Sequence, residues 1–360
     1  MSQAFVVVDT PEQAVDRLAA LHEQATSALS QALKRYLKDR TEPDEAQRAQ
    51  FRYPAIRLTY FSQGEVAATT RAYAKVQVAG TYSVTVTQPA AFRSYLLEQL
   101  RPLMHDYTVT VEVGVSEQNI PYPYVVDQGD ELAGSGITAA TLARVFPSTD
   151  LSAATDNIAD GLYDWESAET LPLALFDAAR TDFSLRRLVH YTGSDWRHMQ
   201  PWILLTNYHR YVDQFIAHGL EQLHQDPRFV RMVLPGNVVI EKGMDNGEAQ
   251  ALVAGVVWHR YQMPAYHLIA ADGDTLVNIG VGPSNAKNIT DHLAVLRPHC
   301  WLMIGHCGGL RQSQTIGDYV LAHAYMRRDG ILDRVVRPWP RCSWRCRKRR
   351  RRSLANAASS

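Results

Sequence analysis

The hydrophobic period of the sequence changes within its first half, and this change restricts the folds open to the chain. Between residues 11 and 38, apolar side chains recur every three or four residues, which predicts one long amphipathic helix. A second helical period covers residues 90–103. Short runs rich in β-branched and aromatic residues predict strands at 55–60, 75–78, 82–88 and 107–115. Helices on one face of a small antiparallel sheet satisfy both periods, so we expect an N-terminal α+β domain over residues 1–150.

The C-terminal half alternates strands with helices. One helix is predicted to follow the turn at 206–210 and to end at residue 220, and another covers 284–296. Strands are predicted at 202–205, 267–270, 275–280, 301–304 and near 319–322. This alternation is typical of an α/β sheet, whose ligands lie at the carboxyl ends of the strands. We therefore expect an α/β domain over residues 176–336. The stretch 151–175, rich in Ser, Thr, Asp, Ala and Gly, is predicted to link the two domains.

Composition and charge exclude several classes of protein. With 46% apolar and 21% charged residues, and no apolar run near the ~20 residues of a membrane span, we expect a cytoplasmic globular protein without membrane contact. The 37 Lys and Arg balance 37 Asp and Glu, but nine of the basic residues lie from Arg337 onward, where no acidic residue occurs. The first 336 residues therefore carry a net charge of −9, and we expect no nucleic-acid partner.

The four cysteines predict neither disulfides nor a metal site. Cys300 and Cys307 lie in an apolar segment bounded by glycines, where reduced core thiols are expected. Cys342 and Cys346 are four positions apart, but no second pair or nearby histidine completes a zinc site.

A first candidate binding turn covers residues 278–285, where a predicted strand meets a helix. Gly280 and Gly282 let backbone amides approach a ligand, and Ser284 stands where it could cap the helix. A helix start suits an anion such as phosphate. The alternative is a plain strand–turn–helix junction. A dinucleotide fingerprint is disfavoured because Asn285 stands where its third glycine would be.

Two further turns follow predicted strands. Residues 305–310 include Cys307 and Gly308 between other glycines, which leaves room for a flat ligand against the backbone; a tight turn is the alternative. Residues 205–212 bring together hydroxyl, amide, imidazole and guanidinium groups, among them Asn207 and Arg210. Arginine can hold a phosphate through two parallel hydrogen bonds. A solvated turn is the alternative there, but three such turns at the ends of strands in one sheet favour a binding site.

These turns lie within longer runs that resemble the AMP nucleosidase family. The run from residue 277 to 287 (Val-Asn-Ile-Gly-Val-Gly-Pro-Ser-Asn-Ala-Lys) and the run from 301 to 311 carry much of the resemblance, which extends from about residue 10 to about residue 333. Other matching runs are 120–124, 183–185, 190–193, 206–212, 263–267 and 291–298.

The resemblance implies a nucleoside phosphorylase-like catalytic domain behind an N-terminal regulatory domain. It implies hydrolysis of AMP to adenine and ribose 5-phosphate by a homohexamer that requires no cofactor, with ATP as an activator and inorganic phosphate as an inhibitor. By similarity, the turns at 207–210 and 282–284 cradle phosphate and ribose, and residues 307–308 lie against the purine. The phosphorylases' glycine–aspartate–proline turn is replaced here by Asn207, Tyr208 and His209. The implied substrate-binding residues are Asn207, Arg210, Gly282, Ser284, Asn285, Cys307 and Gly308.

Near Val335 the resemblance stops, and a basic tail over residues 337–360 follows. We expect a reading-frame shift there, with a nucleic-acid-binding arm or a localisation signal as alternatives. The family's general acid and a Met-Glu pair that grips the ribose lie in the segment beyond, so we expect an incomplete α/β domain with little activity. A non-catalytic nucleotide-binding fragment and a nucleoside phosphorylase are the alternative functions.

Overall fold

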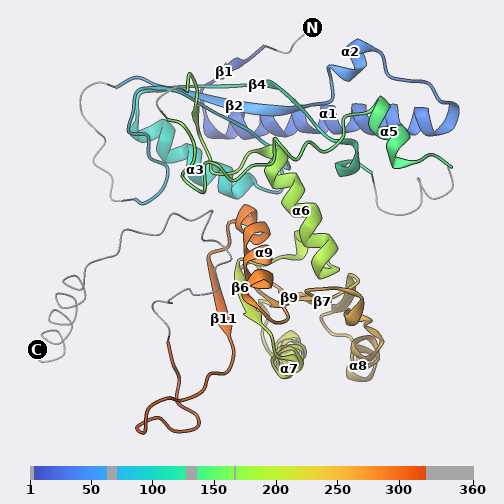
Figure 1. Ribbon diagram of the computed structural model, residues 1–360, viewed down its shortest axis with the longest axis vertical. Coiled ribbons are helices and arrows are strands. Elements are labelled where there is room, and N and C mark those ends of the chain that lie inside the picture. The colour runs from blue at the N-terminus through green and yellow to red at the C-terminus, as the bar shows by residue number, and fades with distance from the viewer. Residues whose placement is uncertain (1–3, 63–70, 127–135, 166–167, 322–360) are drawn as a thin grey trace, which may run out of the picture. The chain divides into compact units, whose positions relative to one another are not determined.

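The computed structural model of this protein describes residues 4–62, 71–126, 136–165 and 168–321 (Figure 1). Contacts divide the chain into a unit of residues 1–305 and a second unit from residue 306 onward. The first unit contains two mixed sheets, one from each half of the sequence. The tail at 337–360 lies outside the described residues.

The first sheet has five strands in the order β1-β4-β2-β3-β5. Its first four strands pair antiparallel, as expected, and β5 adds a short parallel pair to β3. The strands are β1 (Val6–Val8), β2 (Arg52–Tyr60), β3 (Gly80–Thr85), β4 (Val109–Asn119) and β5 (Leu171–Pro172). Since β5 lies within the predicted linker, part of that segment belongs to the first sheet.

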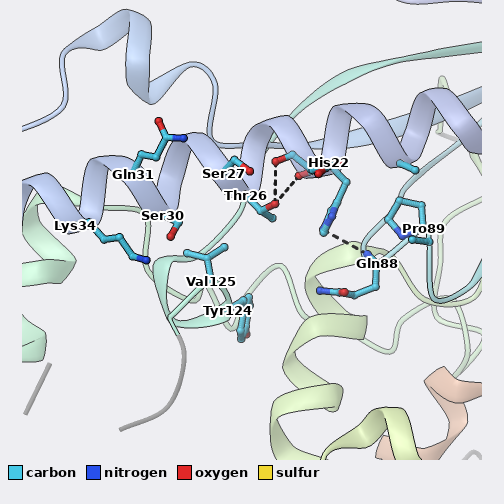
Figure 2. A pocket seen from close by; sticks show the side chains of 13 residues that line it. His22, Thr26, Ser27, Ser30, Gln31, Lys34, Gln88, Pro89, Tyr124 and Val125 are labelled. Carbon is cyan, nitrogen blue, oxygen red and sulfur yellow. Dashed lines mark hydrogen bonds between the residues drawn. The ribbon is translucent and has the colours of Figure 1, made fainter. Parts of the chain in front are cut away.

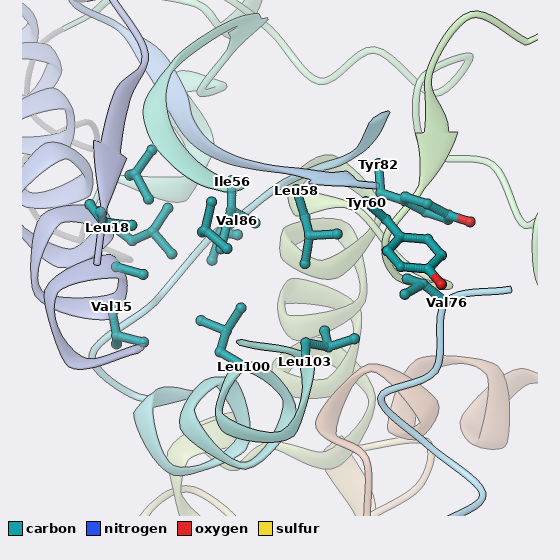
Figure 3. Packing of buried hydrophobic residues seen from close by; sticks show 14 of the residues in the cluster. Val15, Leu18, Ile56, Leu58, Tyr60, Val76, Tyr82, Val86, Leu100 and Leu103 are labelled. Atoms are coloured by element: carbon teal, nitrogen blue, oxygen red, sulfur yellow. The ribbon is translucent and has the colours of Figure 1, made fainter. Parts of the chain in front are cut away.

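The long predicted helix is confirmed as α1 (Pro11–Asp39). The side chain of Thr10 accepts a hydrogen bond from the Gln13 amide at its start, and Arg40 in the left-handed region ends it. Its apolar face packs on β2 and β4 beside α3 (Arg93–Asp106). Figure 3 shows this core, in which Leu18, Leu58 and Leu103 are buried together. The smaller helices here are α2 (Glu45–Arg48), η1 (Tyr122–Tyr124) and α5 (Ala139–Val145).

The second sheet has six strands in the order β11-β6-β10-β9-β7-β8. The pairs β11–β6 and β6–β10 are parallel, and the pairs from β10 to β8 are antiparallel. Its strands are β6 (Trp202–Thr206), β7 (Arg231–Leu234), β8 (Val238–Glu241), β9 (Ala265–Ile269), β10 (Asp274–Asn278) and β11 (Cys300–Ile304). The α/β sheet of the prediction is therefore parallel only on one side.

Four longer helices accompany this half of the chain. They are α6 (Ala178–Thr192), α7 (His209–Gln225), α8 (Asn246–Gly255) and α9 (Pro283–Leu293). Short 3₁₀ turns occur at η2 (Trp196–His198), η3 (Trp258–Arg260) and η4 (Ala294–Leu296). Helix α7 packs on β7, β9 and β10, and α6 packs on α9.

Two predicted strands are wrong where the structure describes them. Residues 75–78 form no strand: Ala74 has a positive φ of 52°, which breaks the extended backbone, although Val76 still reaches the core. Residues 319–321 are also irregular. Strands β7 and β8 and helix α8 were not predicted. Among the described residues, no helix is long and apolar enough to cross a membrane.

Candidate functional site

Three parallel strands of the second sheet end in register at one edge. Thr206 at the end of β6 lies opposite Asn278 of β10 on one side and Ile304 of β11 on the other. Because the chain leaves β6 and β10 at the same level, the turns that follow these two strands are neighbours. This confirms that the turns after residues 206 and 278 share one edge of the sheet.

A buried threonine links the two turns. The backbone carbonyl of Thr206 accepts a hydrogen bond from the Ile279 amide at 2.8 Å, and its hydroxyl accepts one from the Tyr208 amide at 3.2 Å. Asn207, which lies between Thr206 and Tyr208 in sequence, is half-buried. A Cβ at Gly305, just after β11, would lie 3.7 Å from the Asn207 side-chain oxygen. Asn207 therefore faces the backbone that leaves the third strand.

Helix α7 begins at this edge with exposed cationic and aromatic groups. Within the described chain, no side chain caps its first turn, which contains His209 and Arg210. Both are exposed, with Arg210 5.6 Å over the Tyr211 ring and His209 4.3 Å from the ring of Trp258 in η3. Uncapped amides and the positive end of the helix dipole favour an anion beside Arg210.

The turn after β10 depends on two glycines and an asparagine clamp. Gly280 and Gly282 have φ of 65° and 112°, values that suit glycine. The Asn285 amide nitrogen donates to the carbonyls of Ile279 at 3.0 Å and Val281 at 3.4 Å. Asn285, predicted to bind substrate, thus holds the turn closed through its amide nitrogen.

The expectation that Ser284 caps helix α9 is wrong. Gly282, two residues earlier, occupies the cap position and makes no side-chain bond, because Pro283, whose φ is fixed near the helical value, is the first residue of the helix. Ser284 lies inside the first turn and is exposed. Its hydroxyl and the uncapped amides of α9 therefore lie at the same sheet edge as the start of α7.

The predicted purine-facing residues, Cys307 and Gly308, belong to the second unit, in an exposed segment without helix or strand. The expectation that Cys300 and Cys307 are core thiols is wrong, since both are exposed, and neither forms a disulfide among the described residues. Cys300 begins β11, whose side chains are largely exposed because the strand pairs only with β6 in the described part of the chain. Those residues contain no group of three His, Cys, Asp or Glu side chains that could hold a metal.

A polar cavity of about 700 Å³ lies along α1, and sequence reasoning missed it (Figure 2). Thr26, Ser30 and Lys34 line it at helical spacing, a pattern of polar residues that could have been noticed beside the apolar face. His22 also lines it. Burial lowers the pKa of His22 to about 4, and its Nε2 accepts a hydrogen bond from the backbone amide of Gln88 at 3.4 Å. A second cavity of about 260 Å³ shares Gln88 with the first and extends to α6.

Comparison with known proteins extends these observations. A family model described as "Bacterial AMP nucleoside phosphorylase N-terminus" matches residues 13–170. The chain is 49% identical over 334 residues to AMP nucleosidase of Escherichia coli strain K12 and to AMP nucleosidase of Escherichia coli O157:H7, alignments that cover 91% of this chain and 68% of each relative. A solved AMP nucleosidase from Bacteroides thetaiotaomicron aligns at 25% identity and a TM-score of 0.27, over 39% of this chain and 45% of that one.

Proposed function

Because this chain belongs to the AMP nucleosidase family, we propose that it hydrolyses AMP to adenine and ribose 5-phosphate. The observation that carries the proposal is the identity of 49% over 334 residues, which includes the sheet edge where β6 and β10 end. Two helix starts and an exposed arginine meet at that edge, a set of groups suited to a phosphate ester.

The residues at the edge have separate proposed roles. Arg210 and the first amides of α7 bind the phosphate of AMP, since a guanidinium can donate two bonds to its oxygens. Asn207 and Ser284 hydrogen-bond the ribose phosphate. Gly282 gives its backbone close access to the ligand, and Asn285 keeps that backbone in place. Cys307 and Gly308 contact the purine.

The reaction breaks the bond between C1′ of the ribose and N9 of adenine. The electron pair of that bond leaves with adenine, which takes up a proton, while water adds its oxygen to C1′ and loses its own proton. The transition state resembles an oxocarbenium ion, as in other glycoside hydrolysis. Binding of the remote phosphate holds the ribose in place, so binding energy from outside the reacting bond lowers the barrier.

Product analysis tests this function. The protein is incubated with AMP in the absence of inorganic phosphate, and the products are separated by chromatography. Adenine and ribose 5-phosphate are expected in equal amounts, whatever the rate at which they form. Ribose 1-phosphate formed from adenosine only when phosphate is added would indicate a phosphorylase instead. AMP binding without any product would indicate a non-catalytic nucleotide-binding protein.

We also propose the regulation and assembly that the resemblance implies. The hydrolysis needs no cofactor, ATP activates it and phosphate inhibits it. The cavity along α1 is the proposed effector site, because hydroxyls and Lys34 line it. The N-terminal domain ends near residue 150, the linker near 175, and the protein acts as a cytoplasmic homohexamer. If Lys34→Gln leaves the activation by ATP unchanged, the effector site lies elsewhere. Sedimentation of the protein in solution tests whether it forms a hexamer.

A further inference from the structure

Helix α6 makes specific polar contacts with the first sheet through one buried carboxylate. Asp182 accepts hydrogen bonds from the Tyr53 hydroxyl at 2.5 Å and from the Thr87 hydroxyl at 2.8 Å. Tyr53 belongs to β2, and Thr87 lies just after β3. All three residues are almost completely buried. Breaking either bond would leave a buried acceptor less satisfied, so these contacts fix α6 against the sheet.

On another side, α6 holds the last residues of α9. The Ser184 hydroxyl hydrogen-bonds Nδ1 of His292 at 3.0 Å. The His292 ring lies 5.8 Å from the ring of Phe183 and 5.9 Å from that of Tyr191. Arg180, buried and ion-paired with an aspartate at 2.6 Å, donates to the carbonyl of Asp291 at 3.3 Å. We call Arg180, Phe183, Ser184 and Tyr191 the α6 socket.

The opposite end of α9 is the binding turn. Residues 282–285 start this helix of 11 residues, which is about 16 Å long at ~1.5 Å per residue. A helix with intact hydrogen bonds moves as a rigid rod, so a shift of His292 in the α6 socket displaces Ser284. The exposed start of α9 makes no side-chain cap within the described chain, so its position also depends on contacts further along the helix, among which are those of the α6 socket.

We propose that the α6 socket positions residues 282–285 for substrate, and that Asp182 couples this positioning to the first sheet. Ser184, His292 and Asp182 are positioning residues: they touch neither substrate nor the reacting atoms. Their effect on AMP rests on the proposed function, but their effect on α9 does not. The N-terminal sheet thereby influences the substrate turn through direct contacts of one helix.

Two readouts on the full chain test the inference. The variants are Ser184→Ala, which removes the hydroxyl that bonds His292, and Tyr53→Phe, which removes one bond to Asp182. Each is expected to raise the KM for AMP about three- to tenfold, the range for one lost hydrogen bond, with kcat within about twofold. Ser184→Thr keeps the hydroxyl and restores the KM. Hydrogen exchange of peptides covering residues 279–293 increases in the two damaging variants.

Thr192→Val is the matched control. Thr192 is a fully buried residue of α6 whose hydroxyl donates to the Leu188 carbonyl at 2.7 Å and accepts from the Ser194 backbone amide at 3.3 Å, and neither partner belongs to the first sheet or to α9. Its loss destabilises α6 without touching the first sheet or α9, so the KM and exchange at 279–293 stay unchanged. The inference is overturned if folded Ser184→Ala leaves exchange at 279–293 unchanged, or if Thr192→Val matches it. Absence of adenine release from the unaltered protein would refute the proposed function alone, because the exchange readout needs no turnover.

Discussion

The Ile279 amide donates to the Thr206 carbonyl at 2.8 Å and joins two turns through residues that lie 73 positions apart in sequence. Thr206 ends β6 and Ile279 follows β10, so the bond continues the ladder of the two strands by one residue beyond their ends. Both residues are almost completely buried. The two candidate binding turns are therefore fixed to each other, and a change in one should be felt by the other.

The first prediction concerns the backbone of the turn after β10. Gly282 has φ 112° and ψ 153°, a region almost restricted to glycine. Gly282→Ala is expected to lower the free energy of unfolding by ~1–3 kcal/mol and to raise the KM for AMP as the turn relaxes. Denaturant unfolding and initial-rate kinetics measure the two effects.

Gly243→Ala serves as the control for this strain. Gly243 has φ 87° with open space around its Cβ position, and it follows β8, away from the binding turns. The substitution should lower stability while leaving the KM unchanged. Equal KM values for both variants would show that the turn at 282 does not contact the ligand.

Buried titratable groups give the second prediction, a stability that rises with pH between about 4 and 6. Burial lowers the pKa of His22 and His292 to about 4 and that of His267 to about 3, from 6.5. In this range the unfolded chain binds a proton at each histidine that the folded chain excludes, so stability increases with pH. Each such proton contributes a slope of up to about 1.4 kcal/mol per pH unit.

Asp182 changes the stability with pH in the direction opposite to the histidines. Burial raises its pKa from 3.8 to about 6, against the lowering effect of its bonds to Tyr53 and Thr87. The folded state holds the extra proton between these values, so Asp182 lowers stability as pH rises through the same range. Asp182→Asn should therefore give a steeper rise in stability between pH 4 and 6 than the unaltered protein. A shallower rise in denaturant unfolding at several pH values would contradict this assignment.

The third prediction concerns the segment that precedes β5, the last strand of the first sheet in sequence. Residues 151–162 are largely exposed and contain no helix or strand, whereas β5 pairs with β3 and protects the segment after it. Limited proteolysis of the folded protein should cut first between residues 147 and 169, as detected by mass spectrometry. Early cleavage within 82–88, which overlaps β3, would contradict an independently folded N-terminal domain.

Much of this fold could be predicted because the sequence has clear periods. Helix α1 has its apolar residues at regular spacing and a capping threonine, and its predicted limits differ from the observed ones by one residue. The strands β6, β10 and β11 were predicted because each ends at a turn with glycine or polar residues. The hairpin β7–β8 was missed because each strand has only four residues and no alternation of apolar and polar side chains.

The site was predictable in its location but not in its detail. Strand order places the turns at 207 and 279 together, and the alternation of strands and helices in the sequence already indicates that these turns share one edge of the sheet. The position of Ser284 inside α9 depends on the backbone angles at Gly282, which spacing alone does not specify. The Asp182 contacts with Tyr53 and Thr87 join residues about a hundred positions apart, and no local pattern reveals such pairs.

The last prediction concerns Arg210, which is exposed at the start of α7. Loss of a charged hydrogen-bond donor to phosphate typically costs ~1.5–3 kcal/mol of binding, which corresponds to roughly a 10- to 150-fold change. Arg210→Ala should therefore raise the KM for AMP by roughly 10-fold or more. Its melting temperature should change little, because the side chain is exposed. Arg210→Lys keeps the charge but loses the two-pronged geometry, so an intermediate KM is expected.

Arg228→Ala is the control for general loss of positive charge. Arg228 is exposed and paired with Asp226, and it precedes β7, which runs in the same direction as β10. It therefore lies near the amino ends of these strands, at the opposite edge from Arg210. Because phosphate binding at the carboxyl edge is short-ranged in ~0.15 M salt, Arg228→Ala should leave the KM unchanged. An unchanged KM in Arg210→Ala would place the phosphate elsewhere on this edge, and equal increases in both variants would indicate long-range electrostatic attraction in place of direct contact.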